Sequence, residues 1–148
     1  MKFIKSFAVF CFGGLSYGLL EILYRGGTHI SMFFVGGLCF WAIFKIDAAS
    51  LFGGNIIFEA PFCALFVTLA ELCSGVLLNI RLGLEVWDYS GLPFNLWGQI
   101  CLPFSAIWLV LSVPAALASR AMRRFVFGEE IQLLRLPATV KREAQEGG

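Results

Sequence analysis

Apolar residues are concentrated in four segments of the chain, and short polar stretches separate them. The segments cover residues 3–24, 30–46, 56–80 and 100–119. A helix needs about 20 apolar residues to cross the roughly 30 Å of bilayer hydrocarbon, so the second segment is at the lower limit. The pattern predicts an all-α membrane protein with four transmembrane helices, in one transmembrane domain over residues 1–120.

The composition agrees with a membrane-embedded chain. Hydrophobic residues make up 59% of the sequence and charged residues only 14%, against about 25% charged residues in an ordinary soluble domain. This excludes a soluble globular domain, which needs polar side chains to cover its outside. The C-terminal tail mixes both signs of charge and no basic stripe carries aromatic residues, so we expect no nucleic-acid partner.

Lysine and arginine residues predict the orientation of the four segments. If both termini are cytoplasmic, nine basic residues flank the spans on the inner side: Lys2, Lys5, Lys45 and six from Arg120 onward. Only Arg25 and Arg81 then lie on the outer side. Since cytoplasmic loops of membrane proteins are enriched in basic residues, we predict a multi-pass protein of the cell membrane with both termini cytoplasmic.

Polar residues gather on the outer side of this topology. Glu71, Gly75 and Asn79 recur every four residues and therefore share one face of the third helix. A charged carboxylate inside a membrane is costly unless it is paired or protonated, and such residues often mark functional sites. We therefore expect an outward-facing polar pocket. Its candidate residues are Glu21, Arg25, His29, Glu71, Asn79, Trp87, Asp88, Tyr89, Ser90, Asn95 and Gln99.

A structural interpretation of the same residues remains open. Glu71, Asn79 and Gln99 could hydrogen-bond across the bundle and simply hold the helices together, with no ligand involved. Asp88 is expected near Arg25 or His29, where it would hold the loop closed over Glu71. The alternative is that Asp88 caps its own turn through nearby backbone N–H groups.

The connection over residues 81–99 is long for a link between neighbouring helices. Its aromatic residues are suited to the headgroup level of a membrane, and Pro93 stiffens it. We expect an ordered cap over the polar cluster; an aromatic interface loop with no site beneath it is the alternative.

The tail, residues 121–148, is predicted to be cytoplasmic. Between residues 123 and 136, Phe127, Ile131 and Leu134 fall on one face of a helix. A basic amphipathic helix after a membrane span favours contact with the anionic membrane surface. Docking of a cytoplasmic partner such as an ATPase is the alternative.

Other chemistry finds little support in the sequence. The five cysteines lie in or beside apolar segments without a C-x-x-C pair, and there is one histidine, so we expect packing cysteines, no metal and no cofactor. Glu59 begins the third segment on the inner side, where a carboxylate suits the helix dipole and a structural role is expected.

Several short motifs, taken in order, resemble a known family. They are Gly18-x-x-Glu21, Thr28-His29-x-Ser31-Met32, Gly36-Gly37, Glu71-x-x-x-Gly75-x-x-x-Asn79, Val86-Trp87-Asp88-Tyr89-Ser90 and Pro93-x-Asn95-x-x-Gly98-Gln99-Ile100-Cys101. Over roughly residues 13–115 the chain resembles the ABC-transporter type IV (CmpB-like) family of small polytopic membrane proteins. The Trp-Asp-Tyr-Ser block with the following Asn and Gly-Gln is the specific part. The chain has no G-x-x-x-x-G-K-[ST] phosphate loop, so any ATPase would be a separate subunit.

Three classes of function remain open. The first is a transport-related membrane component, which the buried carboxylate and the resemblance favour. The second is a small intramembrane enzyme acting on a lipid or envelope substrate, with His29 and either Glu71 or Asp88 as base and acid. The third is a non-catalytic assembly or regulatory partner. Membrane lipids are expected partners in each case, and another membrane subunit or a homo-oligomer is compatible with all three.

Overall fold

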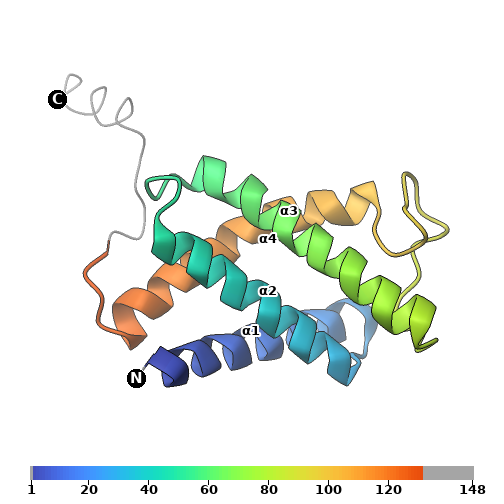
Figure 1. Ribbon diagram of the computed structural model, residues 1–148, viewed down its shortest axis with the longest axis horizontal. Helices are drawn as coiled ribbons and strands as arrows, with labels where there is room; N and C mark the ends of the chain where they lie inside the picture. Colours follow the sequence, from blue (N-terminus) through green and yellow to red (C-terminus); the bar gives the residue numbers. More distant parts are fainter. Residues whose placement is uncertain (1, 132–148) are drawn as a thin grey trace.

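The computed structural model describes residues 2–131 and contains four long helices (Figure 1). They are α1 (Lys2–Arg25), α2 (Ile30–Ala49), α3 (Ile56–Gly75) and α4 (Leu102–Ala121). Two of them continue without a break into short π-helical stretches: α3 into η1 (Val76–Arg81) and α4 into η2 (Met122–Val126). Residues 2–131 contain no β-strand, only an isolated bridge between Leu96 and Ile100.

All four helical runs in this part of the chain are long and apolar enough to cross a membrane, which confirms the prediction of an all-helical fold with four span-length helices. The helix ends differ from the sequence prediction at three places. α2 continues to Ala49, so Asp47 is helical and buried instead of lying in a connection. α4 begins at Leu102, two residues later than predicted, and its helical run continues through η2 to Val126.

Local sequence explains where the helices begin and end. The His29 and Asn55 side chains accept hydrogen bonds from backbone N–H groups two residues on, and so cap the first turns of α2 and α3. α2 ends where Ser50 adopts a left-handed conformation, with φ of 51°. Pro103 stands in the first turn of α4, where its missing N–H has no intrahelical partner to lose.

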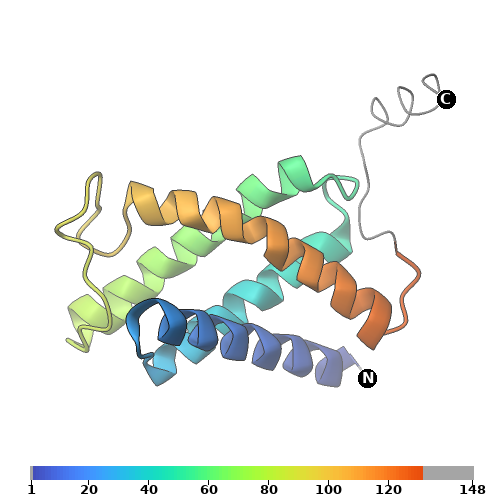
Figure 2. The same cartoon turned by 180° about the vertical axis from the view of Figure 1, so that it is seen from behind.

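The helices form two hairpins, α1 with α2 and α3 with α4, and α2 also packs against both α3 and α4 (Figures 1 and 2). Glycines bring α1 and α2 together. A Cβ atom on Gly14 would lie 2.5 Å from the Phe33 carbonyl oxygen, and one on Gly37 would lie 2.8 Å from the Phe10 carbonyl oxygen. Only glycine fits at such contacts, so the first hairpin is closed by backbone against backbone.

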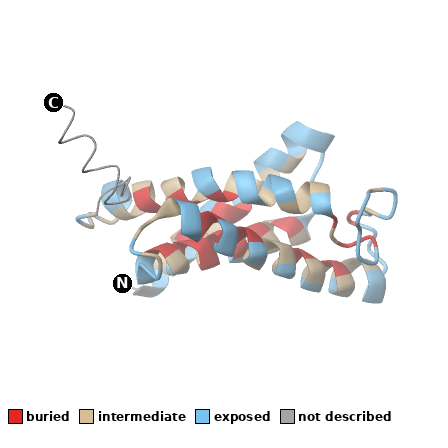
Figure 3. Cartoon of the chain, turned by 90° about the horizontal axis from the view of Figure 1, so that it is seen from above, coloured by how far each residue is buried: buried red, intermediate tan, exposed pale blue. Residues whose placement is uncertain are grey.

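The bundle has two ends, which differ in their contents. The long-loop end carries the 26–29 connection and the segment 82–101; the N-terminal end carries the start of α1, the 50–55 connection and residues 127–131 (Figure 1). Buried residues follow the interior of the bundle and continue into the long loop (Figure 3).

The amphipathic helix expected over residues 123–136 is wrong for residues 127–131. The helical run ends at Val126, and Gly128 takes a left-handed conformation with φ of 66°. Phe127 packs edge-on against Phe44 of α2, with ring centroids 6.0 Å apart, so it belongs to the bundle. The rest of the predicted helix, residues 132–136, lies outside the described residues.

Candidate functional site

Glu71 is buried within α3 and both of its carboxylate oxygens accept hydrogen bonds. The Tyr89 hydroxyl donates to Oε1 at 2.9 Å, and the Trp108 indole N–H donates to Oε2 at 2.8 Å. These donors come from the long loop and from α4, so one carboxylate joins three segments. Tyr89 also stacks on Phe104 with ring centroids 4.4 Å apart, which fixes its position. Trp108 is a partner that the sequence analysis did not identify.

Asn79 and Gln99 form a second layer toward the end of the bundle. The Asn79 amide donates to the Gln99 side-chain oxygen at 2.8 Å, and the Val86 backbone N–H donates to Asn79 Oδ1 at 2.7 Å. The Trp87 indole N–H donates to the Gln99 carbonyl oxygen at 3.0 Å. A Cβ on Gly75 would lie 2.6 Å from the Gln99 side-chain oxygen, so this glycine makes room for the amide. The two Asn79 bonds fasten the long loop to η1, the continuation of α3, and the Trp87 bond holds the loop's own ends together, as expected of an ordered cap.

Glu21 and Arg25 belong to a third group at the end of α1. Arg25 pairs with Glu21 at 2.8 Å and donates to the Val86 carbonyl oxygen at 2.9 Å. The Thr28 hydroxyl also donates to the Glu21 carboxylate. The end of α1 is thereby tied to the long loop through the loop's backbone.

Other candidate residues make mainly local contacts. His29 is exposed and its Nδ1 lies 2.7 Å from the Ser31 hydroxyl. Asp88 accepts from the Ser90 N–H and from the Ser90 hydroxyl, both at 2.8 Å, and the Asn95 amide donates to the Ser90 carbonyl oxygen at 3.1 Å. The two Asp88 bonds agree with the alternative interpretation, in which Asp88 caps its own turn instead of pairing with Arg25 or His29. Across residues 2–131, no ion pair joins Asp88 to a basic side chain.

Two groups of the long loop have shifted pKa values. Hydrogen bonds from the Ser90 backbone N–H and hydroxyl lower the pKa of Asp88, so it remains a charged acceptor at neutral pH. Burial, followed by the negative charge of Glu71, raises the pKa of Tyr89. The Tyr89 hydroxyl therefore keeps its proton and remains a donor to Glu71 throughout the physiological range.

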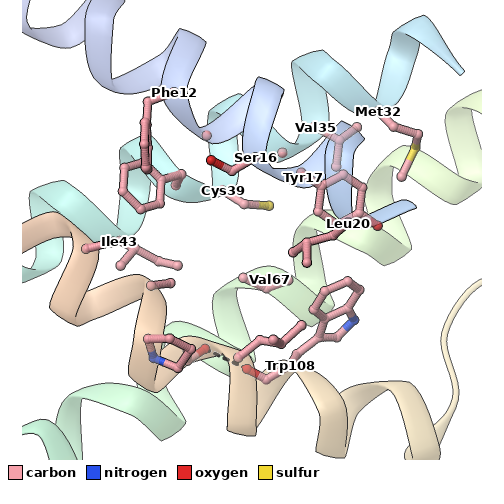
Figure 4. Close-up of a pocket in the computed structure, with 18 of the residues that line it drawn as sticks. Phe12, Ser16, Tyr17, Leu20, Met32, Val35, Cys39, Ile43, Val67 and Trp108 are labelled. Carbon is pink, nitrogen blue, oxygen red and sulfur yellow. Dashed lines mark hydrogen bonds between the residues drawn. The ribbon is translucent and has the colours of Figure 1, made fainter. Parts of the chain in front are cut away.

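A cavity of about 340 Å³ lies among the four helices, next to Glu71 (Figure 4). Its lining is mostly apolar, and Tyr17, Leu20 and Trp108 lie toward one side of it (Figure 4). A second cavity of about 260 Å³ shares these three residues and extends between α1 and α4 to Glu21 and Arg25. We call the pair the central cavity and the α1–α4 cleft. The expected polar pocket is thus, at its centre, an apolar space with polar groups at one end.

The N-terminal end contains a buried ion cluster that the sequence analysis missed. Arg120 donates to Asp47 Oδ1 at 2.8 Å through Nε and to Glu59 Oε2 at 2.5 Å through Nη2. Arg123 donates to Asp47 Oδ2 at 3.0 Å and, through Nε, to Glu129 at 2.7 Å. Asp47, Glu59 and Arg120 are at most 5% exposed. We call these five residues the ion cluster.

The reason for the omission lies in where the sequence prediction placed the helix ends. It placed Asp47 in a connection and Arg120 just past the end of the fourth span, both outside the spans, whereas the structure has both inside helices. Glu59, expected to be structural, is a partner in this cluster. Its Oε1 atom is buried without a hydrogen-bond partner among the described residues.

Comparison with known proteins identifies a family. The family model described as "Putative ABC-transporter type IV" matches residues 4–132, most of the chain, in agreement with the resemblance of the sequence motifs. No curated protein and no solved structure matches the chain.

Proposed function

Because the chain belongs to the ABC-transporter type IV family, we propose that it is a transport-related membrane component whose central cavity holds a ligand beside Glu71. Four helices able to cross a membrane and the family membership support the first part of this proposal. The second part rests on the cavity itself.

The proposal rests on one observation: a carboxylate lies at a cavity that is large enough to hold a ligand. Ligand pockets are mostly apolar, have volumes of roughly 300 Å³ and above, and contain a few polar groups that orient the ligand. The central cavity has about 340 Å³, and Glu71 is the acidic group among its lining residues. Tyr89 and Trp108 hold that carboxylate in a fixed position, so one wall of the otherwise apolar cavity carries a preorganised polar group.

The experiment compares three strains: wild type, a strain lacking the chain, and one that makes Glu71→Gln at wild-type abundance. Mass spectrometry should find a compound whose distribution between cells and medium changes in the deletion strain. The Glu71→Gln strain should show the same change. Leu69→Met, a change at an exposed position on the same helix, serves as the control and should leave that distribution unchanged. If the deletion redistributes no compound, a transport role is wrong.

We also propose that both termini are cytoplasmic, which puts the long-loop end outside the cell. Gly91→Cys and Ser50→Cys place single thiols at exposed positions of opposite ends. A membrane-impermeant maleimide added to intact cells should label residue 91 and not residue 50. The native cysteines lie in the helices or, as Cys101, are buried, so the unchanged chain serves as the blank. The opposite labelling pattern would reverse the orientation.

Any ATPase that acts with this chain would be a separate subunit, since the chain has no phosphate loop. Purification of the tagged full-length chain in mild detergent tests this, and a protein with such a loop should co-purify in comparable amount. The same preparation reports whether the chain forms a homo-oligomer. Within residues 2–131 His29 bonds to Ser31 at the exposed start of α2 and to neither Glu71 nor Asp88, so these contacts do not favour the enzyme alternative.

A further inference from the structure

The seam between α1 and α4 is unlike the other helix contacts of the bundle. In the part of the chain that the structure describes, these two helices make no close backbone contact. Aromatic side chains span the gap instead: Tyr17 lies 5.9 Å from Trp108, and Tyr24 lies 6.3 Å from Phe104, between ring centroids. Since side chains change rotamer far more readily than packed helices separate, this seam is the easiest way into the bundle from the side.

The space behind this seam is apolar and continuous. The central cavity and the α1–α4 cleft share Tyr17, Leu20, Met32, Trp108 and Leu111. Exposed residues of α1 and α4, including Leu20, stand at the rim of the cleft. Because the lining is mostly apolar, water finds few hydrogen-bond partners there. In a membrane, its neighbours at the rim are hydrocarbon chains.

Charged groups of the cleft lie only at its long-loop end. Glu21 and Arg25 form an ion pair there, and Trp87 and Tyr89 of the long loop lie above them. The long loop covers the bundle at this end through the Asn79–Gln99 and Glu71–Tyr89 hydrogen bonds. A water-soluble ligand would have to pass this covered end, whereas a ligand from the bilayer would not.

We propose that the occupant is a membrane lipid, one of whose hydrocarbon chains enters sideways between α1 and α4 and fills the central cavity. Its polar head stays at the long-loop end beside Arg25 and Glu21. This inference rests on the proposed function and names the ligand class of that same cavity. Moving methylene groups from bulk lipid to apolar side chains contributes little binding free energy. The shape of the cleft and its polar end therefore decide which lipid binds.

The experiment uses the full-length protein in vesicles of phosphatidylcholine that contain a small fraction of phosphatidylcholine with a diazirine near the end of one acyl chain. After irradiation, peptide mass spectrometry locates the labelled residues. Labels are expected on residues that face the central cavity, such as Leu111 and Val67, in addition to those on the outer surface of the helices.

Ser16→Phe is the test variant, because Ser16 lines the central cavity and a phenyl ring fills space there. Leu15→Phe is its control: it adds a ring at the next residue, which is 67% exposed on the outer surface. Cavity labels should fall about tenfold in Ser16→Phe, equivalent to about 1.4 kcal/mol, and stay unchanged in Leu15→Phe. Should Ser16→Phe fail to fold, Leu111→Trp with Val110→Trp as its control gives the same comparison from α4.

Two outcomes would overturn the inference. Labels confined to the outer surface of the helices would show that no chain enters, and equal cavity labelling in a filled variant and its control would show that labelling does not require the cavity. If the labelling fails in this way but deletion of the protein still changes the distribution of a compound between cells and medium, the transport role stands and only the ligand class is wrong. Cavity-specific labelling with no redistributed compound would instead keep the lipid site and remove the transport role.

Discussion

The long-loop end and the N-terminal end of the bundle are held together by different chemistry. At the long-loop end, the buried carboxylate of Glu71 accepts hydrogen bonds from two neutral donors, Tyr89 and Trp108. At the N-terminal end, Arg120 bridges two buried carboxylates, those of Asp47 and Glu59. Each set of contacts joins segments that are distant in the sequence.

The difference indicates which end can move. Hydrogen bonds between helices in membranes contribute about 0.6–2 kcal/mol each, so an individual bond of the long-loop end breaks at modest free energy. Removing one partner from a buried ion pair costs about 3–5 kcal/mol, because the remaining charge is left unpaired. We infer that the ion cluster holds the N-terminal end rigid, and that the α1–α4 cleft lies at the end that opens more readily.

The largest effect is expected for Arg120→Met. This change leaves Glu59 buried without its cation and Asp47 with Arg123 alone, and should lower the free energy of unfolding by about 3–5 kcal/mol. Thermal unfolding in detergent, followed by circular dichroism, measures it. Arg124→Met, at an exposed position of the same helical run, is the control and should be nearly neutral. Equal melting temperatures of the two variants would contradict the inference that the ion cluster holds the N-terminal end rigid.

A triple variant sharpens the same test. Adding Asp47→Asn and Glu59→Gln to Arg120→Met removes the unpaired charges together with their partner. Because replacing a whole buried ion pair is far less harmful than breaking one, much of the lost stability should return. No recovery would mean that Arg120 acts through packing of its stem instead of its charge.

At the long-loop end, a smaller effect is expected from Glu71→Leu. The Tyr89 hydroxyl and the Trp108 N–H both lose their acceptor, which should cost about 1–3 kcal/mol of stability. Glu71→Gln keeps an amide oxygen as acceptor and should cost less. Detergent melting curves compare the two changes, and equal, negligible effects would show that Glu71 holds nothing together.

The Asn79–Gln99 contact should give a smaller effect still. A double-mutant cycle with Asn79→Ala and Gln99→Ala is expected to give a coupling energy of about 0.6–1.7 kcal/mol, the range for side-chain hydrogen bonds in membrane proteins. The cycle is evaluated from unfolding free energies in detergent. A coupling energy of zero would mean that other hydrogen bonds of the loop, such as Tyr89 to Glu71 and Arg25 to Val86, attach it to the helices.

The smallest effect concerns Asp88 and His29. Asp88 bonds to Ser90 and His29 bonds to Ser31, so Asp88→Asn and His29→Ala should have additive effects on stability. Unfolding free energies of the two single variants and the double variant measure this. Strong non-additivity would restore the interpretation in which the two residues share one site.

The helices could be predicted from the sequence because hydrophobicity and length decide them directly. The spacing of Glu71, Gly75 and Asn79 placed three residues on one face, and the structure has all three against the long loop or its partners. The ordered cap was predictable as well, because aromatic and polar residues concentrate in one long connection.

The partners of the buried charges could not be predicted in the same way. The Glu71–Trp108 pair and the Asp47–Arg120 pair join different helices, and their geometry depends on how the hairpins pack against each other. No spacing of residues along the sequence indicates how the hairpins pack. The central cavity has the same origin, since it exists because α1 and α4 stay apart.

The order of synthesis gives the ion cluster a further consequence. Asp47 precedes Arg120 by 73 residues, so at about 5–20 residues per second the ribosome adds Arg120 about 4–15 s later. During that interval the first hairpin, already closed by its glycines, carries a carboxylate with no cation beside it. Translation of the end of α4 and of η2 supplies the cations last, first Arg120 and then Arg123. A nascent chain that stops before Arg120 therefore carries the Asp47 and Glu59 carboxylates without either cation, so the first three helices reach their lowest-energy packing only when the fourth is complete.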